Sequence, residues 1–150
     1  MKWRGASHTL PAIIIAAVAV RLAYLHLALG TPLFEVLLID SEFYDRRARE
    51  IAAGDGLGDE PFFMNPLYPY FMAAIYAVFG FEYWAVGMVQ ALLGAMGCYM
   101  LYEIGTQLWR RQVGLIAAGL AAFYGPYVFY DGALLTASPI TCLNLVGLCA

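Results

Sequence analysis

An acidic stretch between residues 30 and 65 holds most of the side chains in this sequence that could do chemistry. Eight of the eleven Asp and Glu residues fall there, beside three of the eight basic ones. Asp40 stands out because it ends the apolar run from Leu33 to Ile39, where the chain is expected to leave a membrane. A carboxylate at such a boundary can have its pKa raised by desolvation and serve as a general base. The simpler interpretation, favoured by the residues alone, is that Asp40 caps a helix beginning at Ser41, and the two roles are compatible.

Arg21 and Asp131 are further candidates outside this stretch. Arg21 lies inside the apolar run of residues 10–29, where a charged side chain normally faces a partner or water. Its partner could be a phosphate or a carboxylate, and snorkelling to the outer interface is an equally good interpretation. Asp131, within Tyr130–Gly132, is a second acid expected at the same outer surface, with capping or breaking a helix as its alternative role.

The charged side chains around Asp40 allow two kinds of ligand. Three arginines could contact anionic head groups or a lipid phosphate, but their acidic neighbours favour a solvated helix face of paired charges: Arg46, Arg47 and Arg49. Three loop acids resemble a loose calcium loop without the order of an EF-hand: Asp55, Asp59 and Glu60. A divalent cation is therefore an open option, and no other cofactor is predicted.

Composition assigns the chain to a membrane. Hydrophobic residues make up 63% and charged residues 13%, against nearly half and about a quarter in ordinary globular domains. The net charge of −3, with basic residues in short groups, excludes a nucleic-acid-binding surface.

The predicted fold is all-α, a polytopic membrane helical bundle with about four transmembrane helices. Crossings are expected at residues 10–29, 83–109, 113–129 and from about 133. Residues 10–29 could also pass as a signal peptide, but no small-residue cleavage site follows and the apolar run continues past Arg21. The chain stops within an apolar run, so we expect the N-terminal part of a longer protein.

The loop over residues 30–82 is predicted to carry surface helices. Residues 41–53 form an amphipathic helix closed by Gly54, with Tyr44 on its apolar side and Asp45 on its polar side. Residues 66–80 would reach only about 22 Å, too short for a hydrocarbon core of about 30 Å, and are placed at the interface or as a re-entrant helix.

Charge parity gives the orientation. Lys2 and Arg4 precede the first crossing and Arg110–Arg111 follow the second, so both groups are expected on the cytoplasmic side. The acidic loop and Asp131 then share the extracytoplasmic face.

Several segments in this order resemble the N-terminal third of the GT-C membrane glycosyltransferases. They are Arg21–Leu25, Asp40–Tyr44, Asn65–Phe71, Phe79–Gly80, Gln90, Tyr102–Gly105 and Tyr130–Gly132. The sequence is most similar to the bacterial branch related to protein O-mannosyltransferases and to the aminoarabinose transferase of lipid A. The resemblance covers nearly all 150 residues.

The resemblance implies a glycosyltransferase of the cell (inner) membrane that uses a polyprenyl-phosphate sugar donor. Asp40 stands at that family's loop acid, which implies that it is the base of an inverting transfer to an unknown protein, lipid or glycan acceptor. The substrate-binding residues predicted with it are Arg21, Glu42, Tyr44, Asn65, Tyr68 and Asp131.

One departure concerns the acceptor side. The lipid A branch has an acid and a Lys immediately before the loop proline, whereas this chain has Met64 and Asn65 before Pro66. Two other functions compete with the enzyme: a transporter or flippase-like protein, which predicts discontinuous helices and internal repeats, and a non-catalytic membrane scaffold.

Overall fold

The computed structural model describes residues 8–31, 37, 39–55 and 64–149. These residues form seven α-helices and no strand, which confirms the all-α fold. The helices are α1 (Thr9–Ala28), α3 (Asp40–Ala52), α4 (Leu67–Phe79), α5 (Tyr83–Leu108), α6 (Arg111–Phe123), α7 (Gly125–Gly132) and α8 (Ala137–Cys149). The predicted apolar segment 33–39 lies largely outside the described residues, as do Asp59 and Glu60.

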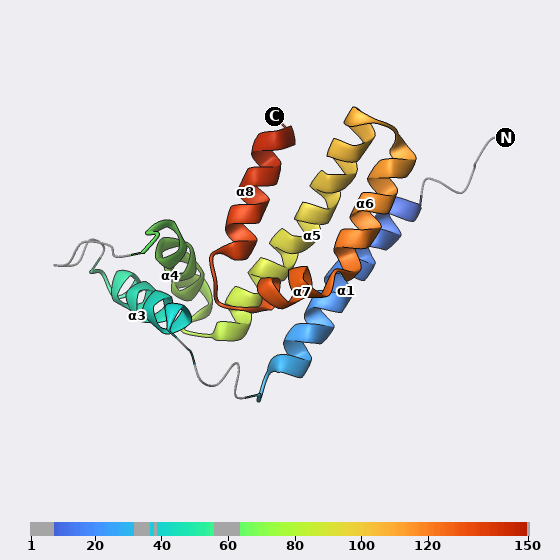
Figure 1. Ribbon diagram of the computed structural model, residues 1–150. Helices are drawn as coiled ribbons and strands as arrows, with labels where there is room; N and C mark the ends of the chain where they lie inside the picture. Colours follow the sequence, from blue (N-terminus) through green and yellow to red (C-terminus); the bar gives the residue numbers. More distant parts are fainter. Residues whose placement is uncertain (1–7, 32–36, 38, 56–63, 150) are drawn as a thin grey trace.

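Among the described residues, two helices are long and apolar enough to cross a membrane, and both were predicted. They are α1, of 20 residues, and α5, of 26 residues. Helix α5 lies at the centre of the bundle and packs against α1, α4, α6, α7 and α8 (Figure 1). At its far end it approaches α6 closely, because a Cβ on Gly105 would lie 2.8 Å from the Cα of Gly114. Small residues of this kind let membrane helices pack backbone to backbone.

The segment of the predicted crossing at 113–129 is bent, a feature that the sequence analysis did not predict. Helix α6 ends at Phe123, and α7 continues at an angle of 57° to it. Pro126 explains the break, because proline has no backbone N–H to donate and its ring clashes with the preceding helical turn. The described residues thus hold two candidate spans, or three if the bent pair counts as one. The 13-residue apolar helix α8 begins near the predicted fourth crossing, which stays a prediction.

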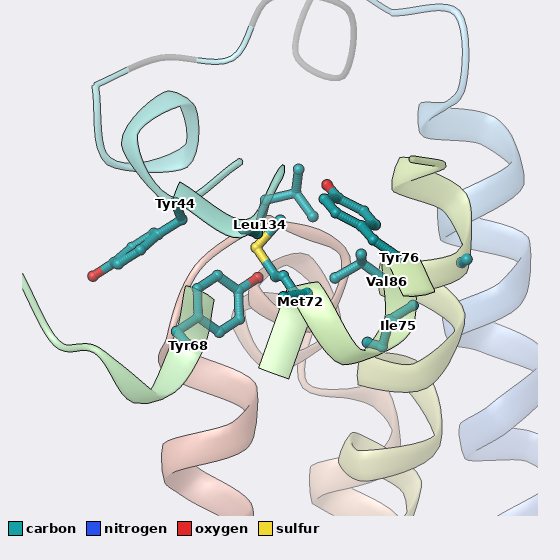
Figure 2. Close-up of a cluster of buried hydrophobic side chains, with 10 residues drawn as sticks. Tyr44, Tyr68, Met72, Ile75, Tyr76, Val86 and Leu134 are labelled. Carbon is teal, nitrogen blue, oxygen red and sulfur yellow. The ribbon is translucent and has the colours of Figure 1, made fainter. Parts of the chain in front are cut away.

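The surface helices α3 and α4 pack on each other beside the start of α5 (Figures 1 and 2). An aromatic layer joins them: the ring of Tyr44 meets that of Tyr68 edge to face at 4.9 Å. Helix α4 has 13 residues, or about 20 Å, in keeping with the predicted short helix. Beyond α3, Gly54 takes a positive φ of 107°, the conformation expected of the residue that closes the helix.

The polar and basic ends of the bundle are separated. Helices α3, α4 and α7 gather where α1 ends and α5 begins, while Arg110 and Arg111 lie at the α5–α6 turn, at the opposite end (Figure 1). This is the arrangement that charge parity predicts. Which end faces the cytoplasm stays a prediction.

Candidate functional site

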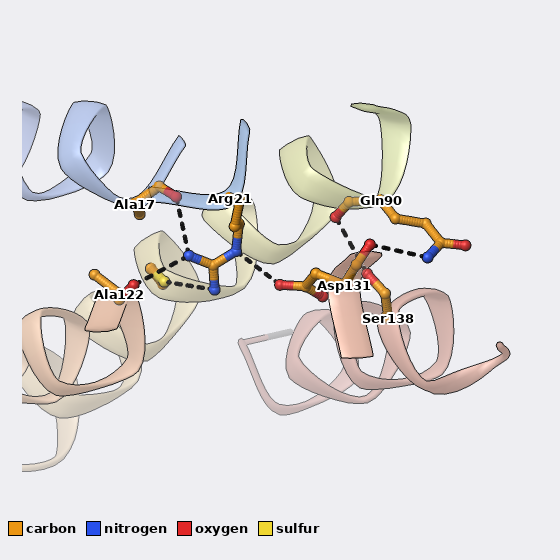
Figure 3. Close-up of polar contacts among 7 residues, drawn as sticks. Ala17, Arg21, Gln90, Ala122, Asp131 and Ser138 are labelled. Carbon is orange, nitrogen blue, oxygen red and sulfur yellow. Dashed lines mark hydrogen bonds and ion pairs between the residues drawn. The ribbon is translucent and has the colours of Figure 1, made fainter. Parts of the chain in front are cut away.

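A buried ion pair joins α1 to α7. Arg21 Nε donates to Asp131 Oδ2 at 2.7 Å, and each side chain is 1% exposed (Figure 3). A charge inside a membrane segment is stabilised when it faces an opposite charge. The structure therefore supports the carboxylate partner for Arg21, and the snorkelling interpretation is wrong because the guanidinium is enclosed.

The other donors of Arg21 are engaged as well. Nη1 donates to the carbonyl oxygens of Ala17, at 3.0 Å, and Ala122, at 3.3 Å. Ala122 belongs to the last turn of α6, whose carbonyls have no partner within the helix. The guanidinium carbon also lies 5.1 Å from the ring centroid of Tyr127 on α7. Arg21 thus stabilises both sides of the break between α6 and α7.

The sequence predicted Asp131 at the outer surface, but its side chain is buried inside the bundle. It sits in the last turn of α7 and is buried, because the bend at Pro126 turns α7 back against α1 and α5. Gly94 on α5 permits this approach, since a Cβ at that position would overlap Asp131 Oδ2 and lie 2.6 Å from Arg21 Nε. A glycine in the middle of α5 is therefore required by the ion pair beside it.

One oxygen of Asp131 is unused. Oδ1 is buried and has no hydrogen-bond partner among the described residues. Asp131 also lines a groove of about 710 Å³ between α5, α6, α7 and α8. The groove is otherwise mostly apolar and aromatic, with Ser138 and Thr141 supplying hydroxyl groups.

Gln90 forms hydrogen bonds with both Tyr68 and Asp131 and so connects them. Its Oε1 accepts from the Tyr68 hydroxyl at 2.6 Å, and its Nε2 donates to the carbonyl oxygens of Asp131, at 3.0 Å, and Ala133, at 2.7 Å (Figure 3 shows the Asp131 contact). Ser138 donates to the Gln90 carbonyl at 3.2 Å. Tyr68 and Gln90 are almost fully enclosed, at 2% and 0% exposure. Tyr68, predicted to bind substrate, is thus also a buried contact between helices.

Asp40 and Glu42 are exposed at the start of α3. The predicted cap is wrong, because α3 begins at Asp40 itself and its N-cap residue is Ile39, with no side-chain cap hydrogen bond. The two acids still interact favourably with the positive end of the helix dipole. The Asp40 side chain is therefore exposed rather than engaged in capping the helix.

Tyr44 lies one turn beyond Asp40 and is buried, at 4% exposure. Burial raises the pKa of its hydroxyl, the negative charge of Asp40 raises it further, and a hydrogen bond with Thr136 opposes both. Tyr44 is therefore a neutral phenol at ordinary pH. Its position makes it the link between α3 and the aromatic layer beneath.

Asn65 is exposed and lies two residues before α4. Its Oδ1 accepts from the backbone N–H of Leu67 at 3.0 Å, which satisfies one of the free donors of the first turn. Asn65 and Tyr68 also line a small recess with Thr136. Both were predicted to bind substrate, and the structure brings them to the same recess.

A second polar cluster was missed by the sequence analysis, which placed Asp45 on the solvent side of its helix. Asp45 is 8% exposed and accepts from Tyr76, at 2.6 Å, Tyr83, at 3.1 Å, and Arg49, at 2.9 Å. The Arg49 guanidinium lies 4.8 Å from the ring centroid of Phe81. These tyrosine hydroxyls reach Asp45 from α4 and α5, which a helical-wheel argument on α3 alone could not show.

The predicted site residues fall into a buried and an exposed group. The buried group is connected through Gln90 and consists of Arg21, Asp131, Tyr68 and Tyr44. The exposed group consists of Asp40, Glu42 and Asn65. Among the predicted site residues that the structure describes, Asp40 and Glu42 are the exposed carboxylates. No group of three or more His, Cys, Asp or Glu side chains that could hold a metal occurs within the described ranges.

Comparison with known proteins agrees with this architecture. Residues 59–149, more than half of the chain, match the family described as Dolichyl-phosphate-mannose-protein mannosyltransferase. No curated protein and no solved structure matches the chain. With its all-helical fold and apolar spans, the chain belongs to the dolichyl-phosphate-mannose-protein mannosyltransferase family of membrane glycosyltransferases.

Proposed function

We propose that this protein transfers a sugar from a polyprenyl-phosphate donor to an acceptor on the extracytoplasmic side of the cell membrane, with Asp40 as the general base. The observation that carries the proposal is the position of Asp40. Its carboxylate is exposed at the start of a surface helix, at the end of the bundle where α4 and α7 also lie. A base there meets an acceptor from water while the donor's lipid chain stays in the bilayer.

The proposed reaction is a single inverting displacement. Asp40 takes the proton of an acceptor hydroxyl, whose oxygen forms a bond to the anomeric carbon of the sugar. The bond from that carbon to the phosphate oxygen breaks on the opposite face, and the lipid phosphate leaves with the electron pair. A positioned base and a positive group near the leaving phosphate would both lower the barrier.

Arg46 is the arginine best placed to meet the phosphate. It is exposed on α3, and it forms no ion pair within the described part of the chain. Arg47 and Arg49, by contrast, pair with Glu50 and Asp45. Arg21 uses its donors inside the bundle, so its part in donor binding would be to hold Asp131 beside the groove. A divalent cation could supplement this charge.

The acceptor is proposed to approach over the start of α4. Asn65 and Tyr68 line the recess there, and Glu42 is exposed on α3. Met64 stands where the related lipid A branch has an acid, so we propose a different acceptor from that branch. It would be a protein, a lipid or a glycan with a free hydroxyl.

The test compares Asp40→Asn with wild type in membranes containing the full-length gene product, using a panel of polyprenyl-phosphate sugars. Loss of a general base is expected to lower the transfer rate by about 10²- to 10⁴-fold. Glu82→Gln is the matched control, since it also turns an exposed acid at this end of the bundle into an amide. Transfer within a few-fold of wild type in Asp40→Asn would remove Asp40 from the mechanism.

A transporter is the second candidate, and one observation favours it. The pair α6–α7 is a broken helix with an ion pair at the break, a feature of transporter binding sites. The two functions differ in the fate of the sugar, which a transporter moves without forming a new bond. Recovery of labelled sugar covalently attached to an acceptor decides for the enzyme, and recovery of intact donor across the membrane decides for the transporter.

A further inference from the structure

Gln90 is a fully buried amide in a membrane-spanning helix, and its polar atoms are all engaged. Its side chain accepts from Tyr68 and donates to the carbonyls of Asp131 and Ala133. Gln90 therefore touches the surface helix α4 on one side and the end of α7 on the other.

The end of α7 explains why an amide is needed at position 90. Asp131 lies in the last turn of α7, so its carbonyl has no partner further along the helix, whereas the Ala133 carbonyl, directly after the helix, already accepts from the backbone N–H of Leu135 at 2.8 Å. Away from water, such groups must be satisfied by the protein itself. The Gln90 amide N–H groups supply the partner that the Asp131 carbonyl lacks and a second partner for the Ala133 carbonyl, which no apolar side chain could do.

The oxygen of the same amide fixes α4. Tyr68 Oη donates to it at 2.6 Å, and the Tyr68 ring supports Tyr44 edge to face at 4.9 Å. Tyr44 lies four residues after Asp40 and therefore on the same side of α3. A continuous series of contacts thus runs from the end of α7, through Gln90 and the two tyrosines, to the helix turn that carries Asp40. Figure 3 shows Gln90 beside Asp131, and Figure 2 shows Tyr68 and Tyr44.

We propose that Gln90 is a positioning residue for Asp40, acting through Tyr68 and Tyr44. This inference rests on the proposed function, because it assumes that Asp40 is the base. The amide fixes the height and tilt of α4 against the α7–α8 junction, and the aromatic layer transmits that position to α3. A displacement of about 1 Å at a reacting group is enough to lower a rate by about 100-fold.

The experiment measures sugar transfer by the full-length protein in Gln90→Met, in Tyr68→Phe and in the double variant. Each single variant is expected to lower kcat at least 10-fold, with little change in KM for the donor, since positioning of the base matters in the transition state. Because both residues act in one series, the double variant should be as slow as the slower single variant and no slower. Gln107→Met is the matched control: the same substitution on α5, at an exposed position, should leave kcat unchanged.

Folding is measured on the same samples, because a buried partner is left unpaired in each single variant. Tyr68→Phe is the milder change, since it removes one hydroxyl and leaves both carbonyl contacts of Gln90. Relative to Gln90→Met, the double variant also removes the unpaired Tyr68 hydroxyl and should regain part of the lost stability, while the Asp131 carbonyl still lacks the amide N–H. Recovery of kcat together with thermal stability in the double variant would overturn the proposal, as would unchanged kcat in the single variants.

The two proposals fail in distinguishable ways. If Asp40→Asn remains active, the base assignment fails and Gln90 has nothing to position. If Asp40→Asn is inactive while both Gln90→Met and Tyr68→Phe retain wild-type kcat, the proposed function stands and the positioning role is overturned.

Discussion

Arg21 and Asp131 are 110 residues apart in the chain, yet Arg21 Nε lies 2.7 Å from Asp131 Oδ2 inside the helix bundle. The pair holds α6 and α7 at their angle, because Arg21 also donates a hydrogen bond to the Ala122 carbonyl at the end of α6. The ion pair therefore stabilises the helix bundle whether or not it also contributes to substrate binding.

Replacing one member of this ion pair should destabilise the protein far more than replacing both members together. Arg21→Met or Asp131→Leu alone leaves a buried charge without its partner, which typically costs about 3–5 kcal/mol. The double variant Arg21→Met/Asp131→Leu leaves neither charge and should be more stable than either single one. Thermal unfolding of the purified protein in detergent measures all three, and losses that simply add would contradict the pairing.

Gly94→Ala should destabilise the protein by about 1–3 kcal/mol, the usual range for overpacking. The added methyl group would overlap Asp131 Oδ2 and crowd Arg21 Nε. Gly119→Ala on α6 is the control, since a Cβ there meets nothing within 4 Å. It should be neutral or stabilise the helix by up to about 1 kcal/mol. Equal effects of the two substitutions on thermal unfolding would contradict this packing.

The buried tyrosine next to Asp45 predicts an alkaline pH dependence. Burial raises the pKa of Tyr76, and its hydrogen bond to the Asp45 carboxylate raises it further. Since the folded pKa is the higher one, this stability is fully present below the unfolded pKa of about 10 and is lost as the pH rises above it. In Asp45→Asn, tyrosinate absorbance should appear at lower pH than in wild type. An unchanged titration would show that Asp45 does not reach Tyr76.

Substitutions of Asn65 separate a capping role from a substrate contact. Asn65→Ala removes the acceptor for the Leu67 N–H and should lower stability by about 1 kcal/mol. Asn65→Asp keeps the acceptor and should keep the stability. If the amide also binds substrate, sugar transfer should fall in both variants; a normal rate in Asn65→Asp would assign the residue to capping alone.

The sequence predicted the positions of the helices better than the contacts between them. Helix length and hydropathy predicted α1, α4 and α5 closely, because each is a continuous apolar segment with clear ends. The break at Pro126 was missed because the hydrophobic pattern continues through it, and the break is what carries Asp131 inside.

The sequence offered candidate site residues but not the contacts that they make. Arg21 was expected to face a carboxylate, a phosphate or the interface, and only tertiary packing selects Asp131. Asp45 was placed in solvent because one face of α3 is polar, whereas its partners come from α4 and α5. Contacts between elements distant in sequence leave no periodic signal along the chain.

The bend between α6 and α7 has a consequence for the surrounding lipid. Helix α6 has 13 residues and spans about 20 Å, roughly 10 Å less than an average hydrocarbon core. Such a hydrophobic mismatch is relieved when the bilayer thins locally around the short helix. We therefore expect lipid head groups to lie deeper beside α6 and α7 than elsewhere, which shortens the path of a lipid-linked phosphate toward the bundle. Sugar transfer in reconstituted bilayers should accordingly be faster with shorter acyl chains than with longer ones, and a rate independent of chain length would show that α6 imposes no such thinning.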